Sequence, residues 1–487
     1  MKNTYTIPAQ LDLSQSLSTF AALVQETLSI DNLEPWNGAV LMEREATIRE
    51  AALVLAGQCI ALLLSTLATH PETPAVSREQ TQGLRTVGSQ SKGRRRITIT
   101  TVGNVSVPLT VAYVVRGAQA GLTGKRSHEW VTGGFYPVLD WLGLRERVSP
   151  LVWSTVAEYG LVSPSFASAQ RLLEDWGIRL SRRRVKRLTY RFGAIGLAQR
   201  EEALQQFVQG TLTAETTLSN QRVVISVDGG RSRLRRNKRG KRRRATGRHG
   251  FHGDWREPLL LTIYAVDEQG KKINTRQMPI TNDGTFAHHE ALLNLLEMHL
   301  VKLGIATCRS VLFIADGARW MWKKLPPLLH RLGVAPSKIN LLLDFYHAVE
   351  HLHAFAQPAF ATQSESTRWV KRSRSLLKHG HFNALLNRMN TLLNSAPAQH
   401  RDDMSKQIEY FSHHPERFEY KRMAALNLPI GSGAIESLVR QVVNLRLKGN
   451  GKFWLEPHAE IMLYGRCQWA AGTWRQFSRS VLMAALS

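Results

Sequence analysis

The sequence predicts an α/β fold, in which a mixed sheet is interrupted by an all-helical insertion and preceded by mainly helical regions. Residues 222–343 alternate between short apolar runs typical of strands and longer helical patterns. The runs at 223–227, 311–315 and 339–343 are continuously apolar, as parallel strands covered on both faces are. Residues 348–425, by contrast, show only helical patterning.

The composition favours a nucleic-acid partner. The chain has 487 residues, which suggests roughly three domains, and its hydrophobic content of 43% is ample for packed cores. Lys and Arg number 64 against 38 Asp and Glu, which gives a net charge of +26. A strongly cationic protein gains affinity for nucleic acid by displacing the counterions of phosphates. A basic soluble protein with another role is the alternative.

The three cysteines, Cys59, Cys308 and Cys467, are scattered and form no C-x-x-C pair. A disulfide framework or a cysteine-rich zinc site is therefore not expected, and a reducing cytoplasm fits this pattern. No basic segment followed by an apolar core opens the chain, so no secretory signal is expected.

Residues 1–90 are predicted to form an N-terminal helical region, with helices ending near residue 74 and a polar, loop-like stretch over 76–95. Within it, residues 51–68 are uncharged and come close to the length of a membrane span. The charged residues just before them favour a buried core helix, so no membrane partner is expected. A membrane span is the alternative.

Residues 91–200 are predicted to form a DNA-binding region, which begins with a hairpin. Residues 97–102 and 105–115 are rich in β-branched side chains and flank a Gly103–Asn104 turn.

A helix-turn-helix is predicted to follow. Ser163–Pro164–Ser165 begins one helix, Gly177 breaks it, and Ser181 caps a second. The second helix carries the cations that we expect to contact DNA: Arg182, Arg183, Arg184, Lys186 and Arg187. An ordinary helix pair with a basic exposed face is the alternative.

Residues 220–352 are predicted to be the first part of the sheet domain, 353–428 the helical insertion, and 429–487 its last helix with a basic and aromatic segment. The expected elements are strands at 222–227, 259–266, 272–280, 311–315 and 339–343, with helices at 286–303 and 320–332.

Three aspartates, Asp228, Asp316 and Asp344, each follow one of the apolar strands, where ligand sites of such sheets lie. Glu436 stands in Gly431–Ser437, at the start of another predicted helix. Carboxylates are preferred ligands of Mg²⁺, and two ions can promote phosphoryl transfer. Asp228, Asp316 and Glu436 therefore form a candidate metal site, for which Asp344 competes. A turn aspartate or a helix-start glutamate is the alternative for each acid alone.

The helix that begins near Glu436 is predicted to have two faces. Glu436, Arg440, Asn444 and Lys448 recur every four residues on the polar face. This face is expected to track phosphates. The apolar face consists of Ile435, Leu438, Val442 and Leu445.

The loop predicted after Asp228 is the most basic part of the chain, with 11 Arg or Lys and no acid over residues 231–248. Arg231 begins it, and Arg242, Arg243 and Arg244 are its densest part. It is expected to clamp a DNA backbone, or else to be a solvated tract. Phe251, His252 and Trp255 follow, either to stack on bases or to anchor the loop.

A competing motif is His347-x-x-Glu350-His351, the inverted zinc-peptidase pattern. It would place two histidine ligands on one helix face, with Glu350 as general base. The motif leaves the net charge and the other acids unexplained, so it is the less favoured reading.

In combination, Val227–Gly229, Ile314–Trp320, Asp344–His347 and Gly431–Ser437 resemble bacterial insertion-sequence transposases of the DDE type, in particular the ISKra-four-like group. The similarity spans residues 140–475. It implies an RNase H-like catalytic core with a helical insertion before the last acid.

The resemblance also implies that Asp228, Asp316 and Glu436 are the catalytic triad, which binds two Mg²⁺ or Mn²⁺ ions. Asp344 and His347 resemble an aspartate–histidine pair of related transposases. The tail is similar to the family's basic and aromatic segment, with DNA-binding candidates Arg440, Arg446, Lys448, Lys452 and Trp454. Phe453 departs from the expected pattern, and residues 91–150 lack the paired cysteines of some relatives.

The expected function is that of a DNA transposase in the bacterial cytoplasm, associated with the nucleoid. Water cuts at the element's end, and the 3′-hydroxyl that is left attacks target DNA. The helix-turn-helix would recognise terminal inverted repeats, and a homo-oligomer would assemble on double-stranded DNA. The alternatives are a DNA-binding protein with an inactive RNase H-like fold and a zinc metallopeptidase.

Overall fold

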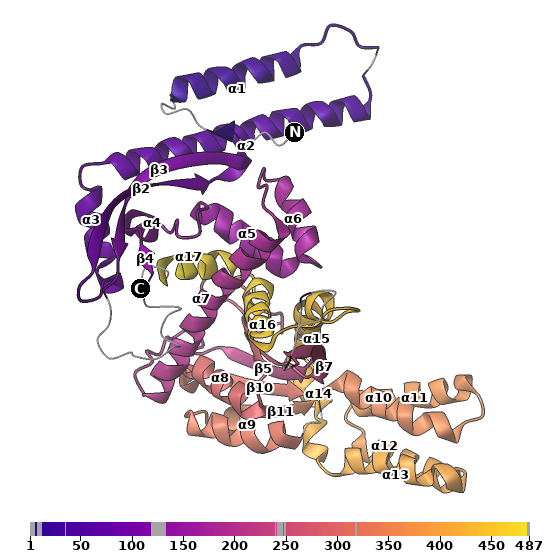
Figure 1. Cartoon of the computed structure of the whole chain (residues 1–487). Helices are drawn as coiled ribbons and strands as arrows, with labels where there is room; N and C mark the ends of the chain where they lie inside the picture. The colour runs from indigo at the N-terminus through magenta and orange to yellow at the C-terminus, as the bar shows by residue number, and fades with distance from the viewer. Residues whose placement is uncertain are drawn as a thin grey trace. The chain divides into compact units, whose positions relative to one another are not determined.

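The computed structural model describes residues 5–6, 12–34, 36–117, 133–238, 240, 247, 250–316 and 319–484, with only the backbone of Tyr5, Thr6 and Arg319. The chain forms two compact units (Figure 1). The first unit comprises Met1–Gln199 and Trp474–Ser487, and the second unit comprises Arg200–Thr473. The last helix thus groups with the N-terminal part of the chain, whereas the sequence alone placed it with residues 429–487.

The first unit contains two helices that lie side by side, α1 (Leu13–Leu28) and α2 (Gly38–Thr69) (Figure 1). The predicted hairpin is present as the antiparallel pair β2 (Gln90–Thr100) and β3 (Val105–Val115), and helix α2 packs on it. The predicted loop over 76–95 is wrong at both ends. Helix α3 covers Thr73–Gln80 and β2 already begins at Gln90, because pairing with β3 extends the strand into polar residues.

Residues 51–68 are helical, but the prediction that this helix is buried is wrong, because most of the α2 surface is not buried. Only Gly57, Ala61 and Leu64 are buried, on the stripe that faces the hairpin. By length and composition α2 is the one helix, among the described residues, that is able to span a membrane, and 17% of its most apolar window is buried.

The predicted helix pair is present in the first unit as α6 (Phe166–Glu174) and α7 (Arg182–Val208). Ser165, rather than Ser163, caps α6 by accepting a hydrogen bond from the Ser168 amide at 3.0 Å. Gly177 has a φ of +61° in the turn, and its Cα faces the backbone of Gly103 with no room for a side chain. Helix α7 is longer than predicted. Its last turns, from Arg200 on, belong to the second unit and pack against the core of that unit.

The remaining helices of the first unit complete its core. They are α4 (Pro137–Trp141), α5 (Pro150–Val162) and α17 (Trp474–Ala484). Trp153 on α5 is buried and donates from its indole Nε1 to the Leu188 carbonyl at 3.1 Å, which fixes α5 against α7.

The second unit is built on a five-stranded mixed sheet of order β11-β10-β5-β8-β9. Strand β5 is central and parallel to β10, which is parallel to β11, whereas β8 is antiparallel to both β5 and β9. The bounds are β5 Arg222–Gly229, β8 Leu259–Val266, β9 Thr281–Thr285, β10 Ser310–Ala315 and β11 Ile339–Leu343. Helices α8 (His289–Lys302) and α9 (Arg319–Arg331) share its apolar core. The predicted mixed α/β fold is confirmed.

The third strand in chain order lies later than the sequence predicted. Residues 272–280 contribute only an isolated bridge from Lys272 to Val266, and the strand is Thr281–Thr285. Its sequence, Thr-Asn-Asp-Gly-Thr, has no apolar residue. Tertiary ionic contacts, rather than local propensity, therefore hold it in the sheet.

Residues 345–425 are helical between short connections, as predicted for the insertion. Helices α10 and α11 pair above α12 and α13, and α10 also contacts α13 (Figure 1). Buried Met404 and Phe411 join the core cluster that includes the sheet. The bounds are α10 Phe345–Ala356, α11 Gln363–Lys378, α12 Phe382–Ser395, α13 Ala398–Ser412 and α14 Tyr420–Ala425.

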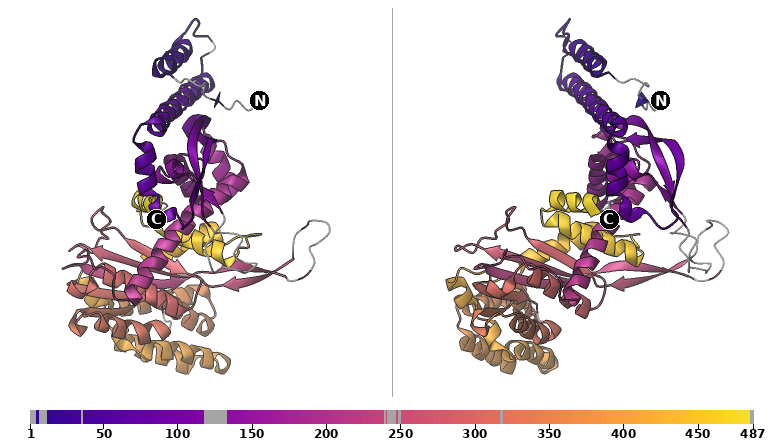
Figure 2. Two further views of the ribbon diagram at one scale, coloured as in Figure 1. Left: turned by 60° about the vertical axis from the view of Figure 1, so that its left-hand side comes forward. Right: turned by 90° about the vertical axis from the view of Figure 1, so that its left-hand side faces the viewer.

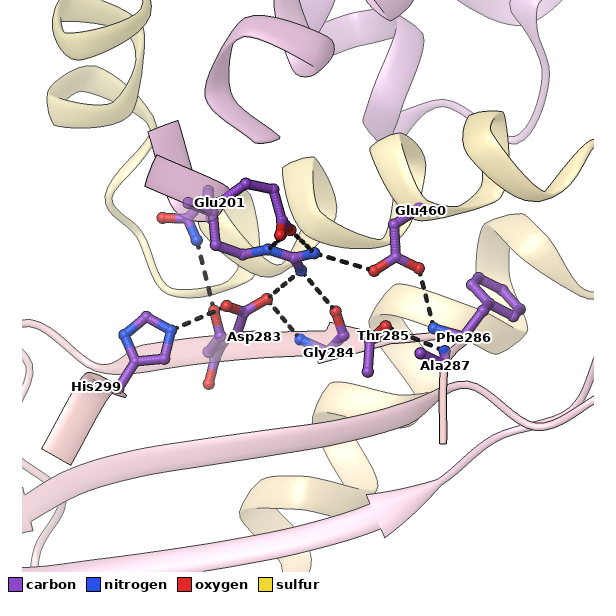
Figure 3. Close-up of polar contacts among 11 residues, drawn as sticks. Glu201, Asp283, Gly284, Thr285, Phe286, Ala287, His299 and Glu460 are labelled. Carbon is purple, nitrogen blue, oxygen red and sulfur yellow. Dashed lines mark hydrogen bonds and ion pairs between the residues drawn. The ribbon is translucent and has the colours of Figure 1, made fainter. Parts of the chain in front are cut away.

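A buried ionic network attaches three helices to β9 (Figure 3). Arg200 of α7 donates to Asp283 Oδ1 at 3.1 Å and to Glu460 of α16 (Glu456–Ala470) at 3.1 Å. His299 of α8 lies 2.9 Å from the other oxygen of Asp283. Burial alone would raise the pKa of Asp283, but the charge of Arg200 and the contact with His299 outweigh it and leave this pKa below its usual value.

We expect Asp283→Ala to lower the free energy of unfolding by about 3–5 kcal/mol, because it leaves the buried Arg200 without its main partner. The matched control is Asp254→Ala, which removes the exposed pair with Arg236 and should cost about 0–1 kcal/mol. Urea denaturation of the full chain measures both losses. Equal losses for the two variants would show that the network does not stabilise the fold.

Candidate active site

The three predicted aspartates lie at the ends of three adjacent parallel strands: Asp228 is the last residue but one of β5, and Asp316 and Asp344 follow β10 and β11. Val227 pairs in register with Ala315, and Ala315 pairs with Leu343, so Asp228, Asp316 and Asp344 stand at the same edge of the sheet. Helix α15 (Gly433–Val439), which carries Glu436, packs against β5 and β8. The fold therefore brings all four predicted acids to one end of the second unit.

The charges of three of these acids interact. Asp228 is partly buried, and burial is the largest cause that raises its pKa from 3.8 to about 6. The negative charges of Asp316 and Glu436 raise it further, while a 2.6 Å hydrogen bond from the Gly229 amide opposes the shift. Repulsion of this kind is typical of sites that bind a cation or hold a proton.

In the part of the chain that the structure describes, no three His, Cys, Asp or Glu side chains approach closely enough to hold a metal ion as they stand. Glu436 instead accepts a 3.0 Å hydrogen bond from the hydroxyl of Ser432, one helical turn earlier. The acids are therefore close enough for their charges to interact, but they do not form a closed coordination shell.

A further carboxylate at this site escaped the sequence analysis. Glu257 follows β7 (Phe251–Arg256), lies against the Cα of Gly229, and raises the pKa of Asp228. Its sequence context, Arg-Glu-Pro, gives no sign of a site. Only the pairing of the strands brings Glu257 back to the end of β5.

Asp344 is buried, with 2% of its surface exposed, and both its oxygens accept backbone hydrogen bonds. Oδ1 accepts from the His347 amide at 2.6 Å as the N-cap of α10, and Oδ2 accepts from the Ser432 amide. The Asp344 amide in turn donates to the Ala315 carbonyl at 2.9 Å. Asp344 thus joins the end of β10, the start of α10 and the turn before Glu436.

The histidines of the zinc-peptidase motif face each other but are otherwise engaged. The rings of His347 and His351 lie 4.9 Å apart and edge to face. His351 Nδ1 contacts Gln407 Oε1 at 2.6 Å, and its ring stacks on Tyr410. Glu350 lies 3.4 Å from His347 Nδ1 and is mostly exposed. This packing is typical of structural histidines, so it does not favour the peptidase alternative.

The sequence predicted a loop for the basic tract after Asp228, and this prediction is wrong for its first part. The tract begins a hairpin of β6 (Ser232–Asn237) and β7, which reaches out from the sheet (Figure 2). Alternate residues of β6, Ser232 and Leu234, are buried, and this period of two is what allows so many cations in a strand. Of the predicted DNA contacts here, Arg231 is exposed, and Arg242, Arg243 and Arg244 lie outside the described residues.

Cations and aromatic rings interleave on this hairpin. The Arg233 guanidinium lies 4.6 Å from the ring centre of Trp255 and 5.5 Å from that of Phe453. Arg231 also lies over Trp255, at 5.6 Å. Trp255 is 47% exposed and Phe251 is 40% exposed, so both rings are open to a ligand. The surface suits a polyanion with stacked bases.

Trp454 pairs with strand β6 of this hairpin, and Arg446 packs on the Trp454 ring. Trp454 exchanges backbone hydrogen bonds with Arg233 and Arg235, and its Nε1 donates to the Leu447 carbonyl at 2.9 Å. The Arg446 guanidinium lies 5.2 Å from the Trp454 ring. Trp454 is 8% and Arg446 is 3% exposed, which corrects the expectation that they contact DNA directly. Trp454 pairs with β6 through its backbone, and its side chain is buried, whereas Phe453 is partly buried.

The helix after Glu436 changes its pitch. Residues Arg440–Leu447 form a π-helix, whose hydrogen bonds span five residues instead of four. Arg440 and Lys448 are exposed, as predicted, but Leu445 of the predicted apolar face is 57% exposed. Val443 and Arg446 take the buried positions instead, because the wider turn shifts the face. Lys452 is partly buried.

The cations of α7 in the first unit are mostly exposed, as a helix-turn-helix requires. These are Arg182, Arg183, Lys186 and Arg187. Arg184 is the exception, because it is half-buried and its guanidinium donates to the Arg147 carbonyl at 3.2 Å.

We expect Asp228→Asn to stabilise the protein at about pH 7.5 by up to about 3 kcal/mol, reduced by solvent screening. The folded-state pKa is raised, so the stability linked to Asp228 is present below pH 3.8 and lost as the pH rises through about 6. The gain should therefore shrink towards about pH 4. Thermal denaturation of the full chain at both pH values measures it, and Asp254→Asn is the matched control. A gain that does not depend on pH would rule out charge repulsion as its cause.

The candidate site thus combines two features of the second unit, a group of carboxylates at the end of the sheet and a cationic hairpin that begins next to Asp228. A comparison with protein-family models finds no match for this chain, and a comparison with curated protein sequences finds none.

Proposed function

We propose that the protein is a DDE-type transposase, which cuts DNA at the ends of an insertion sequence and transfers the strand into target DNA. The observation that carries this proposal is the partly buried Asp228 beside Asp316 and Glu436: burial first, and then the negative charges of these two acids, raise the pKa of Asp228 to about 6. Three acids from distant parts of the chain share one electrostatic site, beside a hairpin suited to a phosphate backbone.

The fold of the second unit supports an RNase H-like assignment. An acid follows the central strand β5, and another follows the parallel strand β10. The helices of the insertion come between β11 and the helix with Glu436. This order is what the resemblance to DDE transposases implies.

The carboxylate site fits hard divalent cations. Mg²⁺ and Mn²⁺ prefer carboxylate oxygens, and a cation would offset both the burial and the acidic neighbours that raise the pKa of Asp228. Asp228, Asp316 and Glu436 would hold two such ions. When bound, the ions would activate the attacking oxygen and stabilise the leaving oxygen.

The other residues of the site would position these acids and the DNA. Ser432 holds the Glu436 carboxylate through its hydroxyl, and Asp344 fixes the turn on which Ser432 stands. The cations of β6 would bind phosphates, while exposed Trp255 would stack on a base. The helix α7 would read the terminal inverted repeats. Such a protein would act as a homo-oligomer on double-stranded DNA, in the bacterial nucleoid.

We expect wild-type protein with Mg²⁺ to nick a labelled DNA fragment, which carries the gene and both flanks, at the ends of the element. Glu436→Gln should abolish the nicks, because it removes a ligand charge with little change in shape. Glu456→Gln, an exposed glutamate at the start of α16, is the matched control and should cut normally. Tight DNA binding without cutting by any variant would favour the inactive RNase H-like alternative. Equal cutting by Glu436→Gln would make Asp344 the next residue to change.

We also expect the hairpin to contribute phosphate contacts. Replacing Arg231 and Lys238 by Gln should weaken DNA binding, and should make the slope of log affinity against log salt shallower by about 0.9 for each lost contact. The control is Lys271→Gln with Arg276→Gln, two exposed cations between β8 and β9. Fluorescence anisotropy over a salt series measures the slopes. Equal slopes for the two double variants would exclude the hairpin from the DNA interface.

A further inference from the structure

The helical insertion brings one hydroxyl to the carboxylate site. Tyr410 of α13 stacks on His351 of α10, with ring centres 3.6 Å apart and planes at 18°. It also meets the ring of His347 at 6.3 Å. Both histidines lie in the first two turns of α10, which begins immediately after Asp344. Tyr410 is therefore held close to the acidic end of the sheet.

Two contacts with His351 fix the position of Tyr410. Gln407, one turn earlier on α13, contacts His351 Nδ1 at 2.6 Å, so the same histidine is both stacked and hydrogen-bonded to α13. Burial lowers the pKa of His351, which keeps its ring neutral and suited to stacking. Helix α13 thus cannot slide along α10 without breaking both contacts.

The hydroxyl of Tyr410 has no such partner. Its oxygen is buried and makes no hydrogen bond within the part of the chain that the structure describes. A buried hydroxyl without a partner costs about 1–3 kcal/mol. Burial raises the pKa of Tyr410, and the charges of Asp316 and Asp344 raise it further, so the phenol stays protonated next to these acids. The hydroxyl is therefore a neutral hydrogen-bond donor on which the charges of Asp316 and Asp344 act.

We propose that Tyr410 donates a hydrogen bond from its hydroxyl to a non-bridging oxygen of the phosphodiester bound at the carboxylate site. The inference rests on the proposed function. The oxygens of buried Asp344 accept from the His347 and Ser432 amides, and neither accepts from the Tyr410 hydroxyl. A phosphate oxygen is an anionic acceptor of the right kind, and a neutral donor binds it without adding charge to the acids. The helical insertion would then supply a substrate-contacting group as well as packing.

The alternative is that the hydroxyl has no ligand and Tyr410 serves only to pack. Tyr420 gives an internal comparison, because its hydroxyl is also buried without a hydrogen bond among the described residues, although its ring packs on Phe345 at 5.0 Å in the core. Tyr420 is fully buried, whereas Tyr410 is only partly buried as a residue, and the charge of Asp316 raises the pKa of Tyr410 but is not among the causes that raise the pKa of Tyr420.

The experiment compares Tyr410→Phe with Tyr264→Phe in the full chain. Tyr264, on β8, also has a buried phenol whose pKa is raised, to about 12, but its pKa is raised by burial alone and not by the site's acids. Three quantities are measured for each protein: Mn²⁺ affinity by electron paramagnetic resonance, affinity for the element-end duplex in Ca²⁺, and the rate of cutting in Mg²⁺ at saturating DNA.

We expect Tyr410→Phe to cut about 10²-fold more slowly, as the loss of one donor to a reacting group does, with Mn²⁺ affinity unchanged. Tyr264→Phe should match wild type in all three measurements. Wild-type cutting by Tyr410→Phe, or a parallel loss of Mn²⁺ affinity, would overturn the role of Tyr410 and leave the proposed function standing. If wild-type protein neither cuts nor binds Mn²⁺ in a manner that depends on Asp228, the proposed function fails, and this inference fails with it.

Discussion

The geometry of the candidate site depends on the two hydrogen bonds that Asp344 accepts. One comes from the start of α10 and the other from Ser432, so a single buried carboxylate joins the insertion to the turn before Glu436. The Phe345 amide donates to the Ile430 carbonyl at 3.1 Å and closes the same junction. Because buried backbone amides without partners are costly, this junction is a strong constraint. Through it the helix with Glu436 is placed relative to the strand ends.

The sheet of the second unit carries a buried and a partly buried acid in two opposite arrangements. At β9 the buried Asp283 is surrounded by Arg200 and His299, and its charge is compensated. At β5 the partly buried Asp228 faces other acids, whose charges add to the effect of burial and raise its pKa. The first arrangement stabilises the fold. The second costs stability, which is a common property of sites that await a charged ligand.

The sequence was sufficient to predict those elements whose local pattern of residues determines their structure. Strands β5, β10 and β11 are continuous apolar runs, and the acids after them could be placed by register alone. Strand β9 could not be predicted, because its polar residues are held by contacts with Arg200 rather than by their own propensity. Glu257 could not be found either, since only the fold carries it to Gly229. The π-helix likewise exposes Leu445, against the period of an α-helix.

The hairpin joins residues from opposite ends of the second unit, because Leu234 in β6 forms a bridge with Trp454 after the π-helix. Pairing between segments so far apart in the chain has a high entropic cost and forms late in folding. During synthesis, the cations of β6 therefore leave the ribosome long before Phe453 and Trp454 exist to order them. The finished arrangement of cations and aromatic rings then forms only when the whole unit has folded, so a truncated or misfolded chain would carry the same charges without this arrangement.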